Sequence, residues 1–359
     1  MEPVIIIGGG PAGAAAAITL SSSGIPNVVL DADKNSFKPG ESLPPNAAAA
    51  LINLGIEKRI NRWGSSPYHG INTYWGSTAG QYRHFFAEPH AAGWHLNRTC
   101  FEAGLRDMAT QCGTQWLKGW SFDGIRENSG KITVNAAAGH GQMKSITASF
   151  VIDCSGRASL VSKSQGGRRN ILDRLIAFYA MIEGLPTFVK STTFVESVSD
   201  GWWYAAPGGK NSTMVYFMTD SDLYDIAAHD KALWFHEHLS GTCHLVKKIP
   251  GIVESTISSV GISTATTSVT NKPYGGGWIA AGDALFTLDP LTSFGITAAL
   301  NGGYHAAKAV AATLNGDQGA VSTYLQNMQD TFNLSLEMLQ NQYRLEQRWP
   351  NERFWSRRH

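Results

Sequence analysis

The chain has 359 residues, of which 43% are hydrophobic and 16% are charged, and its formal net charge is +1. This balance is typical of a globular protein and gives no broad electrostatic attraction to nucleic acid or to an anionic membrane surface. The four cysteines show no metal-ligand spacing, and no apolar stretch is long enough to span a membrane. We therefore expect a cytoplasmic protein with no metal site and with neither nucleic acid nor membrane as a partner.

The first thirty residues have the pattern of a βαβ unit. A β-branched run at 4–7 predicts a strand, the Gly-x-Gly-x-x-Gly sequence at 8–13 predicts a tight turn, and an Ala-rich run predicts a helix to Leu20. A second strand follows and ends at Asp31. An acidic residue at the end of that second strand makes this arrangement typical of dinucleotide-binding proteins.

Each part of this unit has a predicted role toward a dinucleotide. Gly8 permits the tight turn, Gly10 lets a pyrophosphate approach the backbone, and Gly13 lets the helix pack closely on the strand. The helix N-terminus attracts the phosphates, and Asp31 accepts hydrogen bonds from the adenosine ribose. The residues predicted to contact the dinucleotide here are Gly8, Gly10, Pro11, Ala12, Gly13, Asp31 and Ala32.

Further along the chain, helices and strands follow in mixed order. We expect a helix over 46–54, short strands over 71–86, a helix over 101–112 and strands at 131–134 and 149–153. Residues 177–269 are mostly strand-like, with one helix at 232–239. A strand at 277–281 is followed by a helix that begins at 295, and a last helix is expected over 321–345.

This order predicts an α/β (α+β) protein in which a Rossmann-type nucleotide-binding domain is interrupted by a mainly antiparallel sheet. We assign 1–70, 93–170 and 270–315 to the nucleotide-binding domain. Residues 71–92 and 171–269 form the predicted substrate domain, and 316–359 form a C-terminal helical segment.

A second dinucleotide element stands at residues 281–296. A strand ends in Gly282-Asp283, and a Pro-Leu turn then leads to Gly295 at the start of a helix. Asp283 can bind a ribityl or ribose hydroxyl, while the N–H groups of Gly295 and Ile296 can stabilise negative charge on a ring carbonyl. A flavin ring gains such charge on reduction and a nicotinamide ring does not. The predicted cofactor is therefore FAD.

With these motifs the chain resembles the single-component FAD-dependent monooxygenases and their relatives, the flavin-dependent halogenases and geranylgeranyl reductases. The resemblance includes the 153–159 segment, Asp-Cys-Ser-Gly-Arg-Ala-Ser. It implies that the Glu41-Ser42 turn runs along the flavin and that Arg98 lies near the flavin and its phosphates. The further cofactor-binding residues that we predict are Glu41, Ser42, Arg98, Asp283, Pro290, Ser293, Gly295 and Ile296.

Two local differences disfavour halogenation. Halogenases of this superfamily carry a lysine shortly after the Gly-Glu-Ser turn, and the matching stretch at 66–71 has none. Their Trp-x-Trp-x-Ile-Pro motif corresponds to residues 202–207, where Trp202 and Pro207 are present but the second Trp and the Ile are not.

A closer resemblance is to the flavoproteins that mature tryptophylquinone cofactors of lysine and glycine oxidases. It rests on residues 93–98, 200–207 and 219–220 and on the ending at 346–358. It implies hydroxylation of a tryptophan side chain in the precursor protein of a quinone-cofactor oxidase, through reduced FAD, O₂ and a flavin C4a-hydroperoxide. The alternatives are a small-molecule flavin hydroxylase or reductase of secondary metabolism and a catalytically silent flavin-bearing chaperone.

Candidate catalytic residues come from the aromatic strands and from the histidines. Trp202, Trp203, Tyr204, Tyr216 and Phe217 are candidates for the walls of an indole pocket. Histidines at 69, 84 and 95 are candidates for proton transfer. Because no second Gly-x-Gly-x-x-Gly exists, NAD(P)H is expected to bind only transiently as a reductant. The predicted catalytic residues are His69, His95, Trp202 and Tyr204.

Overall fold

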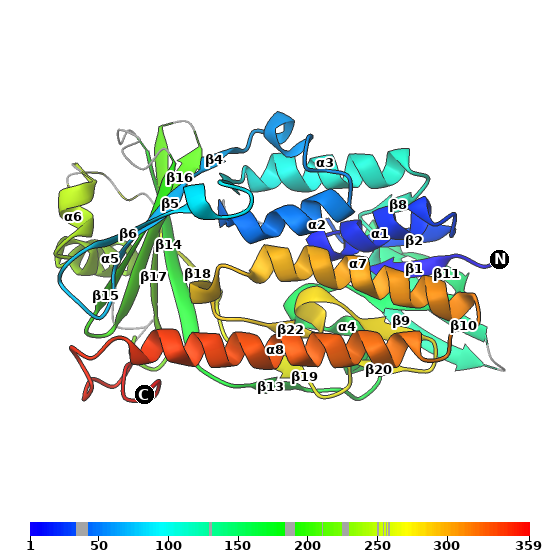
Figure 1. Cartoon of the computed structure of the whole chain (residues 1–359). Coiled ribbons are helices and arrows are strands. Elements are labelled where there is room, and N and C mark those ends of the chain that lie inside the picture. The colour runs from blue at the N-terminus through cyan, green and yellow to red at the C-terminus, as the bar shows by residue number, and fades with distance from the viewer. Residues whose placement is uncertain are drawn as a thin grey trace.

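A computed structural model describes residues 1–33, 42–128, 131–183, 191–209, 211–224, 230–249, 251–253, 255, 257 and 259–359. Figure 1 shows two main sheets side by side, with the long helix α8 (Ala320–Arg344) running past both. No helix in the described part of the chain combines the length and apolarity that a membrane crossing requires. The predicted fold class is confirmed: a Rossmann-like unit is interrupted by an antiparallel sheet and followed by a helical C-terminus.

The first sheet carries the βαβ unit. Its strands are parallel except for the edge strand β20, which pairs antiparallel with β21. The central strands are buried because helices cover them, so they consist of apolar runs rather than alternating patterns. In spatial order the strands are β20 (Tyr274–Gly275), β21 (Trp278–Ala280), β12 (Phe150–Asp153), β1 (Val4–Ile7), β2 (Asn27–Asp31) and β8 (Gln115–Lys118).

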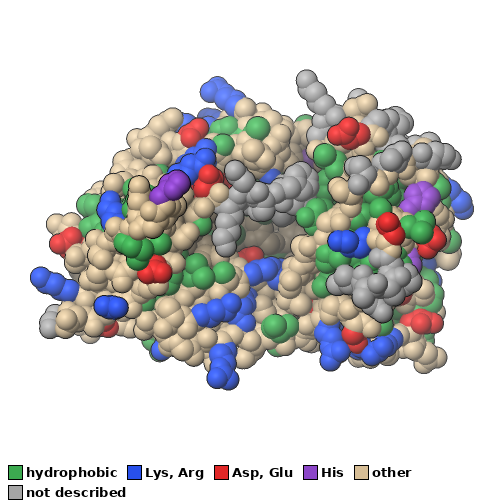
Figure 2. Space-filling model, turned by 180° about the vertical axis from the view of Figure 1, so that it is seen from behind, with side chains coloured by type: hydrophobic (Ala, Val, Ile, Leu, Met, Phe, Trp, Pro, Cys, Tyr) green, Lys and Arg blue, Asp and Glu red, His purple; other side chains and the backbone are tan. Residues whose placement is uncertain are grey.

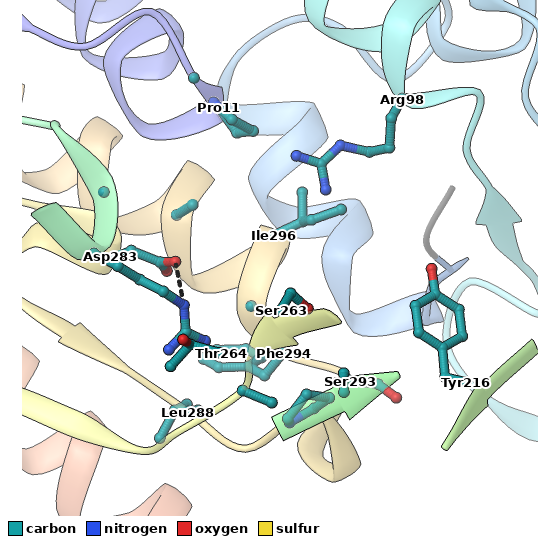
Figure 3. Close-up of a pocket in the computed structure, with 18 of the residues that line it drawn as sticks. Pro11, Arg98, Tyr216, Ser263, Thr264, Asp283, Leu288, Ser293, Phe294 and Ile296 are labelled. Atoms are coloured by element: carbon teal, nitrogen blue, oxygen red, sulfur yellow. Dashed lines mark ion pairs between the residues drawn. The ribbon is translucent and has the colours of Figure 1, made fainter. Parts of the chain in front are cut away.

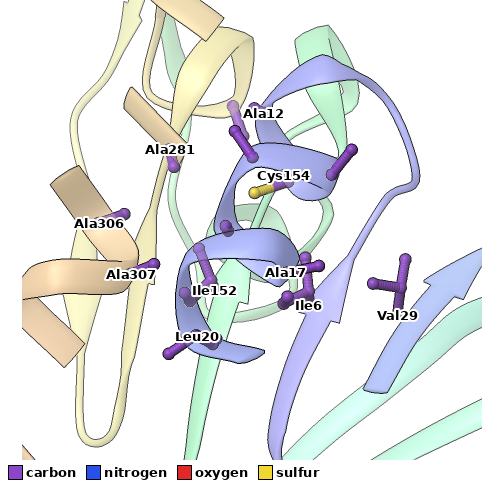
Figure 4. Close-up of a cluster of buried hydrophobic side chains, with 14 of the residues drawn as sticks. Ile6, Ala12, Ala17, Leu20, Val29, Ile152, Cys154, Ala281, Ala306 and Ala307 are labelled. Carbon is purple, nitrogen blue, oxygen red and sulfur yellow. The ribbon is translucent and has the colours of Figure 1, made fainter. Parts of the chain in front are cut away.

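Small residues let two helices approach each other beside this sheet. Helix α1 (Pro11–Ser22) packs against α7 (Gly295–Leu314), and Figure 4 shows Ala306 and Ala307 of α7 on one side of α1 and Ala17 of α1 beside Ile6 of the sheet. A Cβ atom added at Gly303 of α7 would collide with the carbonyl oxygen of Ala12. The Ala-rich sequence of α1 is therefore explained by close packing on both sides.

The second sheet is larger and mainly antiparallel; the pairing of β15 with β5 is parallel. Helices α5 (Lys231–Ser240) and α6 (Leu245–Lys248) lie on its outer face (Figure 1). In spatial order the strands are β18 (Gly261–Thr264), β14 (Leu175–Glu183), β17 (Ser212–Asp220), β16 (Gly201–Gly209), β15 (Thr192–Val198), β5 (Gly70–Tyr74) and β6 (Gln81–His84). The domain boundaries that we assigned from the sequence stay predictions.

The other elements connect these sheets. Helix α3 (Arg98–Gln111) packs against α1 and begins earlier than predicted, because Asn97 caps it by accepting a hydrogen bond from the Cys100 N–H. A meander of β9 (Ser121–Asn128), β10 (Lys131–Ala138) and β11 (Gln142–Ala148) was predicted only in part. Its outer strands are largely exposed and so lack an apolar pattern. The remaining elements are β3 (Ser42–Leu43), β4 (Ser66–Tyr68), β7 (Gly93–His95), α2 (Ala48–Asn53), α4 (Leu160–Ser164), β13 (Arg169–Ile171), β19 (Ser268–Thr270) and β22 (Phe286–Thr287).

The C-terminal segment packs on the inner face of the second sheet. After α8 the chain turns back, and Phe354 and Trp355 are completely buried. The Trp355 indole N–H donates to the Val198 carbonyl at 2.8 Å. Arg357 and Arg358 both pair with the buried carboxylate of Asp220, each at 2.6 Å. The basic and aromatic ending is thus part of the core of the second sheet.

Candidate functional site

A pocket of about 680 Å³ lies between the two sheets. Its walls come from the start of α1, the start of α7, the Gly282–Ala284 turn and the inner face of the second sheet. Figure 3 shows Asp283 and Tyr216 on opposite sides of the pocket, with Ile296 between them and with Pro11 and Arg98 above. Figure 2 shows the molecule from behind the view of Figure 1. This face is hollowed near its middle, and Lys and Arg side chains gather below the hollow.

The glycine turn before α1 forms one end of the pocket. Gly8 has a φ of +107°, and a Cβ added there would collide with the Cys154 carbonyl oxygen. A Cβ at Gly13 would collide with the Gly8 carbonyl oxygen, whereas a Cβ at Gly10 would meet no atom of the described residues within 4 Å. Two of these glycines are therefore required by packing, and Gly10 leaves space at the pocket wall.

Two helices begin at the pocket without a side-chain cap from the described residues. Within that part of the chain no side chain caps α1 at Gly10 or α7 at Phe294. Their first N–H groups and the positive ends of their dipoles thus stand at the pocket, where phosphates or an anionic ring can be bound. The open position at Gly10 together with these uncapped N-termini fits a flavin dinucleotide.

Arginine side chains surround Asp283 at the same end. Arg157 Nε lies 3.9 Å from Asp283 Oδ2, as the dashed line in Figure 3 shows. Arg169 donates to the Asp283 carbonyl at 2.7 Å and to Ser159 Oγ at 2.6 Å, and so fixes the turn from behind. Arg98 lines the pocket and pairs with Glu102 at 2.6 Å. Positive charge at this end suits a pyrophosphate group.

Asp31 lies at the end of β2, close to the glycine turn, but not among the residues that line this pocket. Its Oδ2 accepts a hydrogen bond from the Trp116 indole at 3.1 Å, and its Oδ1 accepts one from the Asp33 N–H at 3.1 Å. The carboxylate is thus held in a fixed orientation. Its predicted contact with the ribose, and that of Ala32, stay predictions.

The opposite wall of the pocket is aromatic. Tyr204 of β16, Tyr216 of β17 and Tyr179 of β14 stand in register on adjacent strands. The ring centroids of Tyr204 and Tyr216 are 5.7 Å apart, and those of Tyr216 and Tyr179 are 6.1 Å apart. Trp202 and Met218 form the next row. This wall offers apolar, ring-shaped surfaces that suit a planar organic molecule.

The expectation that Trp203 and Phe217 also line the pocket is wrong. Successive side chains of a strand point to opposite faces, so Trp202 and Trp203 cannot share one. Trp203 stacks on Phe217 at 4.7 Å between ring centroids and meets Phe235 of α5 in the outer core.

Three polar residues join the two ends of the pocket. The Tyr204 hydroxyl donates to Ser42 Oγ at 3.0 Å, and Ser42 Oγ is 2.7 Å from His95 Nδ1. Burial, together with the charge of His69, lowers the pKa of His95 to about 3, so its imidazole is neutral at physiological pH. His95 stands behind Ser42 rather than at the pocket surface.

Only some of the predicted site residues lie at the pocket wall. His69 and His84 stack on each other away from the pocket, at 6.2 Å between ring centroids, and do not line it. Glu41 lies outside the described residues. The predicted residues that the structure brings together at the pocket wall are Gly10, Pro11, Ala12, Ser42, Arg98, Trp202, Tyr204, Asp283, Pro290, Ser293, Gly295 and Ile296.

Several lining residues were not among our predicted site residues. Arg157 belongs to a motif that we recognised, but its orientation into the pocket depends on the turn after β12. Tyr179 and Met218 could have been found by aligning the alternation of their strands with that of Tyr204. Ser263 and Thr264 of β18 show no sequence signal that distinguishes them from other exposed strand residues.

Comparison with known proteins gives a family and a group of relatives. Residues 1–332 match the family described as FAD binding domain. The putative FAD-dependent oxidoreductase LodB of Marinomonas mediterranea is 26% identical over 99% of this chain and 96% of its own length. The 1H-pyrrole-2-carbonyl-[peptidyl-carrier protein] brominase of Pseudoalteromonas luteoviolacea is 26% identical over 89% of this chain and 80% of its own length.

Solved structures share the fold. The myxobacterial chondrochloren halogenase CndH has a TM-score of 0.88 at 20% identity, over 99% of this chain and 85% of its own. The peptidyl tryptophan dihydroxylase QhpG has a TM-score of 0.82, also at 20% identity, over 99% of this chain and 78% of its own. At such identities the likeness establishes the fold alone.

These findings correct our functional expectation. Several relatives that span most of this chain are named as a brominase or as halogenases, whereas LodB is named only as an oxidoreductase. The prediction of tryptophan hydroxylation in a precursor protein is therefore wrong, and so is the argument that disfavoured halogenation. That argument treated two short motifs as decisive, although relatives named as halogenases match the chain as a whole. The prediction of FAD is confirmed at the level of the family.

Proposed function

Since this chain belongs to the FAD binding domain family, we propose that it is an FAD-dependent enzyme that halogenates a small aromatic molecule. The observation that carries this proposal is a single pocket with a dinucleotide cradle at one end and a row of aromatic side chains at the other. The names of the relatives favour halogenation as the reaction.

The pocket volume supports a small-molecule substrate. About 680 Å³ lies in the usual range for a ligand pocket. Bound FAD would fill the flavin end, and the substrate that we propose would lie along the tyrosine row. In the described part of the pocket the charged side chains are Arg98, Arg157 and Asp283, and none of them belongs to the strands that form the aromatic wall. The substrate that we propose is accordingly neutral where it meets the aromatic wall.

The residues of this chain would bind FAD, orient it toward the substrate and keep water out of the pocket. Gly10 and the α1 N-terminus hold the pyrophosphate, and the α7 N-terminus faces the ring. Bound in its reduced form, FAD supplies with O₂ the two-electron oxidation that converts a halide ion into an electrophilic halogen. The aromatic wall excludes water, which would otherwise consume that oxidant.

We also propose that the protein is cytoplasmic and that NAD(P)H binds transiently as the reductant.

Hydroxylation of the same substrate is a second candidate, because one observation favours it. Among the described residues that line the pocket there is no lysine, the residue that the halogenases this chain resembles carry shortly after the Gly-Glu-Ser turn. An enzyme without it could transfer oxygen directly to the aromatic ring. The two candidates share cofactor, oxidant and substrate class and differ in the atom that is transferred.

One experiment separates the two. The FAD-loaded protein is given NADH, a flavin reductase, O₂, bromide and a panel of neutral phenols, pyrroles and indoles, and the products are analysed by mass spectrometry. A product with the bromine isotope pattern supports halogenation. A product that gains one oxygen, with or without bromide, supports hydroxylation. If neither product exceeds that of the Gly10→Val variant, both candidates fail.

A further inference from the structure

The C-terminal helix reaches the pocket through one buried side chain, Tyr343. This residue lies in the last turn of α8 and is 3% exposed. Its hydroxyl donates to Asp289 Oδ2 at 2.8 Å and accepts a hydrogen bond from the Trp202 indole N–H at 3.0 Å. Trp202 belongs to the aromatic wall of the pocket, and Asp289 precedes the turn that leads to α7. Tyr343 therefore links the two sides of the pocket from behind.

Asp289 in turn fixes the turn at the flavin end. Its Oδ1 accepts a hydrogen bond from the Leu291 N–H at 2.8 Å, and its carbonyl accepts one from Thr292 Oγ1 at the same distance. The turn continues to Ser293, which has a φ of +50°, a conformation that a residue with a side chain adopts at a cost. Pocket-lining residues follow directly, up to Gly295 and Ile296 at the start of α7.

The tail holds Tyr343 from its other side. The guanidinium of Arg358 stands over the Tyr343 ring, 5.2 Å from its centroid, and also pairs with Asp220 at 2.6 Å. Tyr343 thus belongs to a buried network in which Arg358 contacts its ring and Asp289, before α7, accepts a hydrogen bond from its hydroxyl. Buried networks of this kind keep one arrangement, because any other leaves polar atoms unpaired.

We propose that Tyr343 is a positioning residue for the flavin. Its hydroxyl holds Asp289 and Trp202 in one arrangement, so that the start of α7 presents its N–H groups to the cofactor at a fixed place. This inference rests on FAD binding and does not depend on whether halogen or oxygen is transferred. N–H groups at a helix start stabilise negative charge, so a loosened turn binds FAD less tightly and makes the flavin harder to reduce.

The test is the Tyr343→Phe variant, with Tyr324→Phe as its matched control. Tyr324 lies on the same helix and is also 3% exposed, and its hydroxyl donates to the Ala280 carbonyl at 3.0 Å. It does not line the pocket. Both variants lose one buried hydroxyl, which makes two hydrogen bonds at Tyr343 and one at Tyr324. Each protein is stripped of FAD and titrated with it, and the flavin midpoint potential is measured against a reference dye.

We expect Tyr343→Phe to raise the FAD dissociation constant about tenfold and to lower the midpoint potential, while Tyr324→Phe leaves both at the wild-type value. The proposal is overturned if Tyr343→Phe matches the wild type, or if the control shows the same changes. If Tyr343→Phe does not fold, Trp202→Phe removes one of the two hydrogen bonds and keeps a ring in the wall. A smaller change in the same direction then supports the proposal, and wild-type values overturn it.

Discussion

Glu346 and Arg348 form a bidentate ion pair beneath the second sheet. Arg348 Nε is 2.9 Å from Glu346 Oε1, and Arg348 Nη2 is 2.6 Å from Oε2. Glu346 is completely buried and also accepts hydrogen bonds from Ser197 Oγ at 2.6 Å and from the Gly76 N–H at 2.8 Å. One carboxylate therefore ties the end of α8 to strand β15 and to the loop after β5.

Replacing this carboxylate by an amide is expected to destabilise the protein. Glu346→Gln leaves Arg348 without its counter-charge and should cost about 3 kcal/mol of unfolding free energy. The measurement is urea unfolding at neutral pH. Glu337→Gln, on the exposed face of the same helix, is the control and should change stability by less than about 0.5 kcal/mol. Equal stability of the two variants would show that the pair contributes nothing.

The same site predicts how stability changes in acid. Burial opposes ionisation of Glu346, but the hydrogen bonds from Arg348, Ser197 and the backbone outweigh it and lower the pKa to about 2. The stabilisation is present above the unfolded-state pKa of 4.5 and is lost as the pH falls toward 2. Wild type should therefore lose more stability between pH 5 and pH 3 than Glu346→Gln. Parallel pH curves for the two proteins would contradict this prediction.

The contribution of Asp289 to stability changes with pH in the opposite direction to that of Glu346. Burial raises its pKa from 3.8 to about 6, although the Leu291 N–H, Tyr343 and Arg358 favour the carboxylate; the charge of Asp173 adds to the rise. The folded protein then binds a proton more tightly than the unfolded chain, so this site loses about 3 kcal/mol of stability as the pH rises from 4 to above 6. Asp289→Asn should lack this loss. The measurement is the unfolding free energy of both proteins at pH 5 and pH 7.5. If wild type and Asp289→Asn differ by the same free energy at the two pH values, the assignment is refuted.

Gly10 and Gly13 are expected to respond differently to the same substitution. Gly10 has an extended backbone that valine tolerates and a Cβ direction that is open, so Gly10→Val should fold with wild-type stability. Its side chain would occupy pocket space and weaken FAD binding more than about tenfold. Gly13→Val places a Cβ against the Gly8 carbonyl and should destabilise the fold itself. Circular dichroism and flavin absorbance of the purified proteins measure the two effects; a Gly10→Val protein with full FAD occupancy would exclude the proposed cradle.

His95 is expected to act through Ser42 rather than through its own charge. His95→Leu removes the partner of Ser42 Oγ and should weaken binding of a neutral phenol to the FAD-loaded protein about fivefold. His95→Asn keeps a polar atom near the position of Nδ1 and should restore most of the affinity. Because the pKa of the buried imidazole lies near 3, phenol binding should show no step near the usual histidine pKa of 6.5. A step there in the wild type that His95→Asn abolishes would contradict this view.

The sequence allowed the nucleotide-binding half to be predicted in more detail than the substrate half. The βαβ unit and the Gly282–Asp283 turn have local chemical signatures, since a glycine or an acid is required at each position. The aromatic wall depends on which face each strand turns inward. Trp202 and Trp203 are equivalent as sequence letters, and only the pairing of β16 with β17 assigns the first to the pocket and the second to the outer core.

The role of the C-terminal tail was likewise hidden from the sequence. Its arginines have the composition of a basic surface, yet Asp220, the buried partner of Arg357 and Arg358, lies at a position that only the fold brings close to them. The hydrogen bond between Tyr343 and Asp289 spans 54 positions along the chain, and nothing in the spacing of the two residues signals it. Long-range polar pairs of this kind follow from topology and not from local pattern.

Helix α8 also has a mechanical consequence. Near its start, Tyr324 is bonded to Ala280 of the first sheet; near its end, Gln342 accepts a hydrogen bond from Trp75 and Tyr343 accepts one from Trp202, both beside the second sheet. Helix α8 therefore connects the two sheets and is anchored to each of them by hydrogen bonds (Figure 1). A hinge motion that opened the pocket would have to break one of these anchorages. With both ends of α8 anchored, we expect substrate and product to enter and leave the pocket through movements of loops and side chains. The distance between the cofactor end and the aromatic wall is then expected to stay constant.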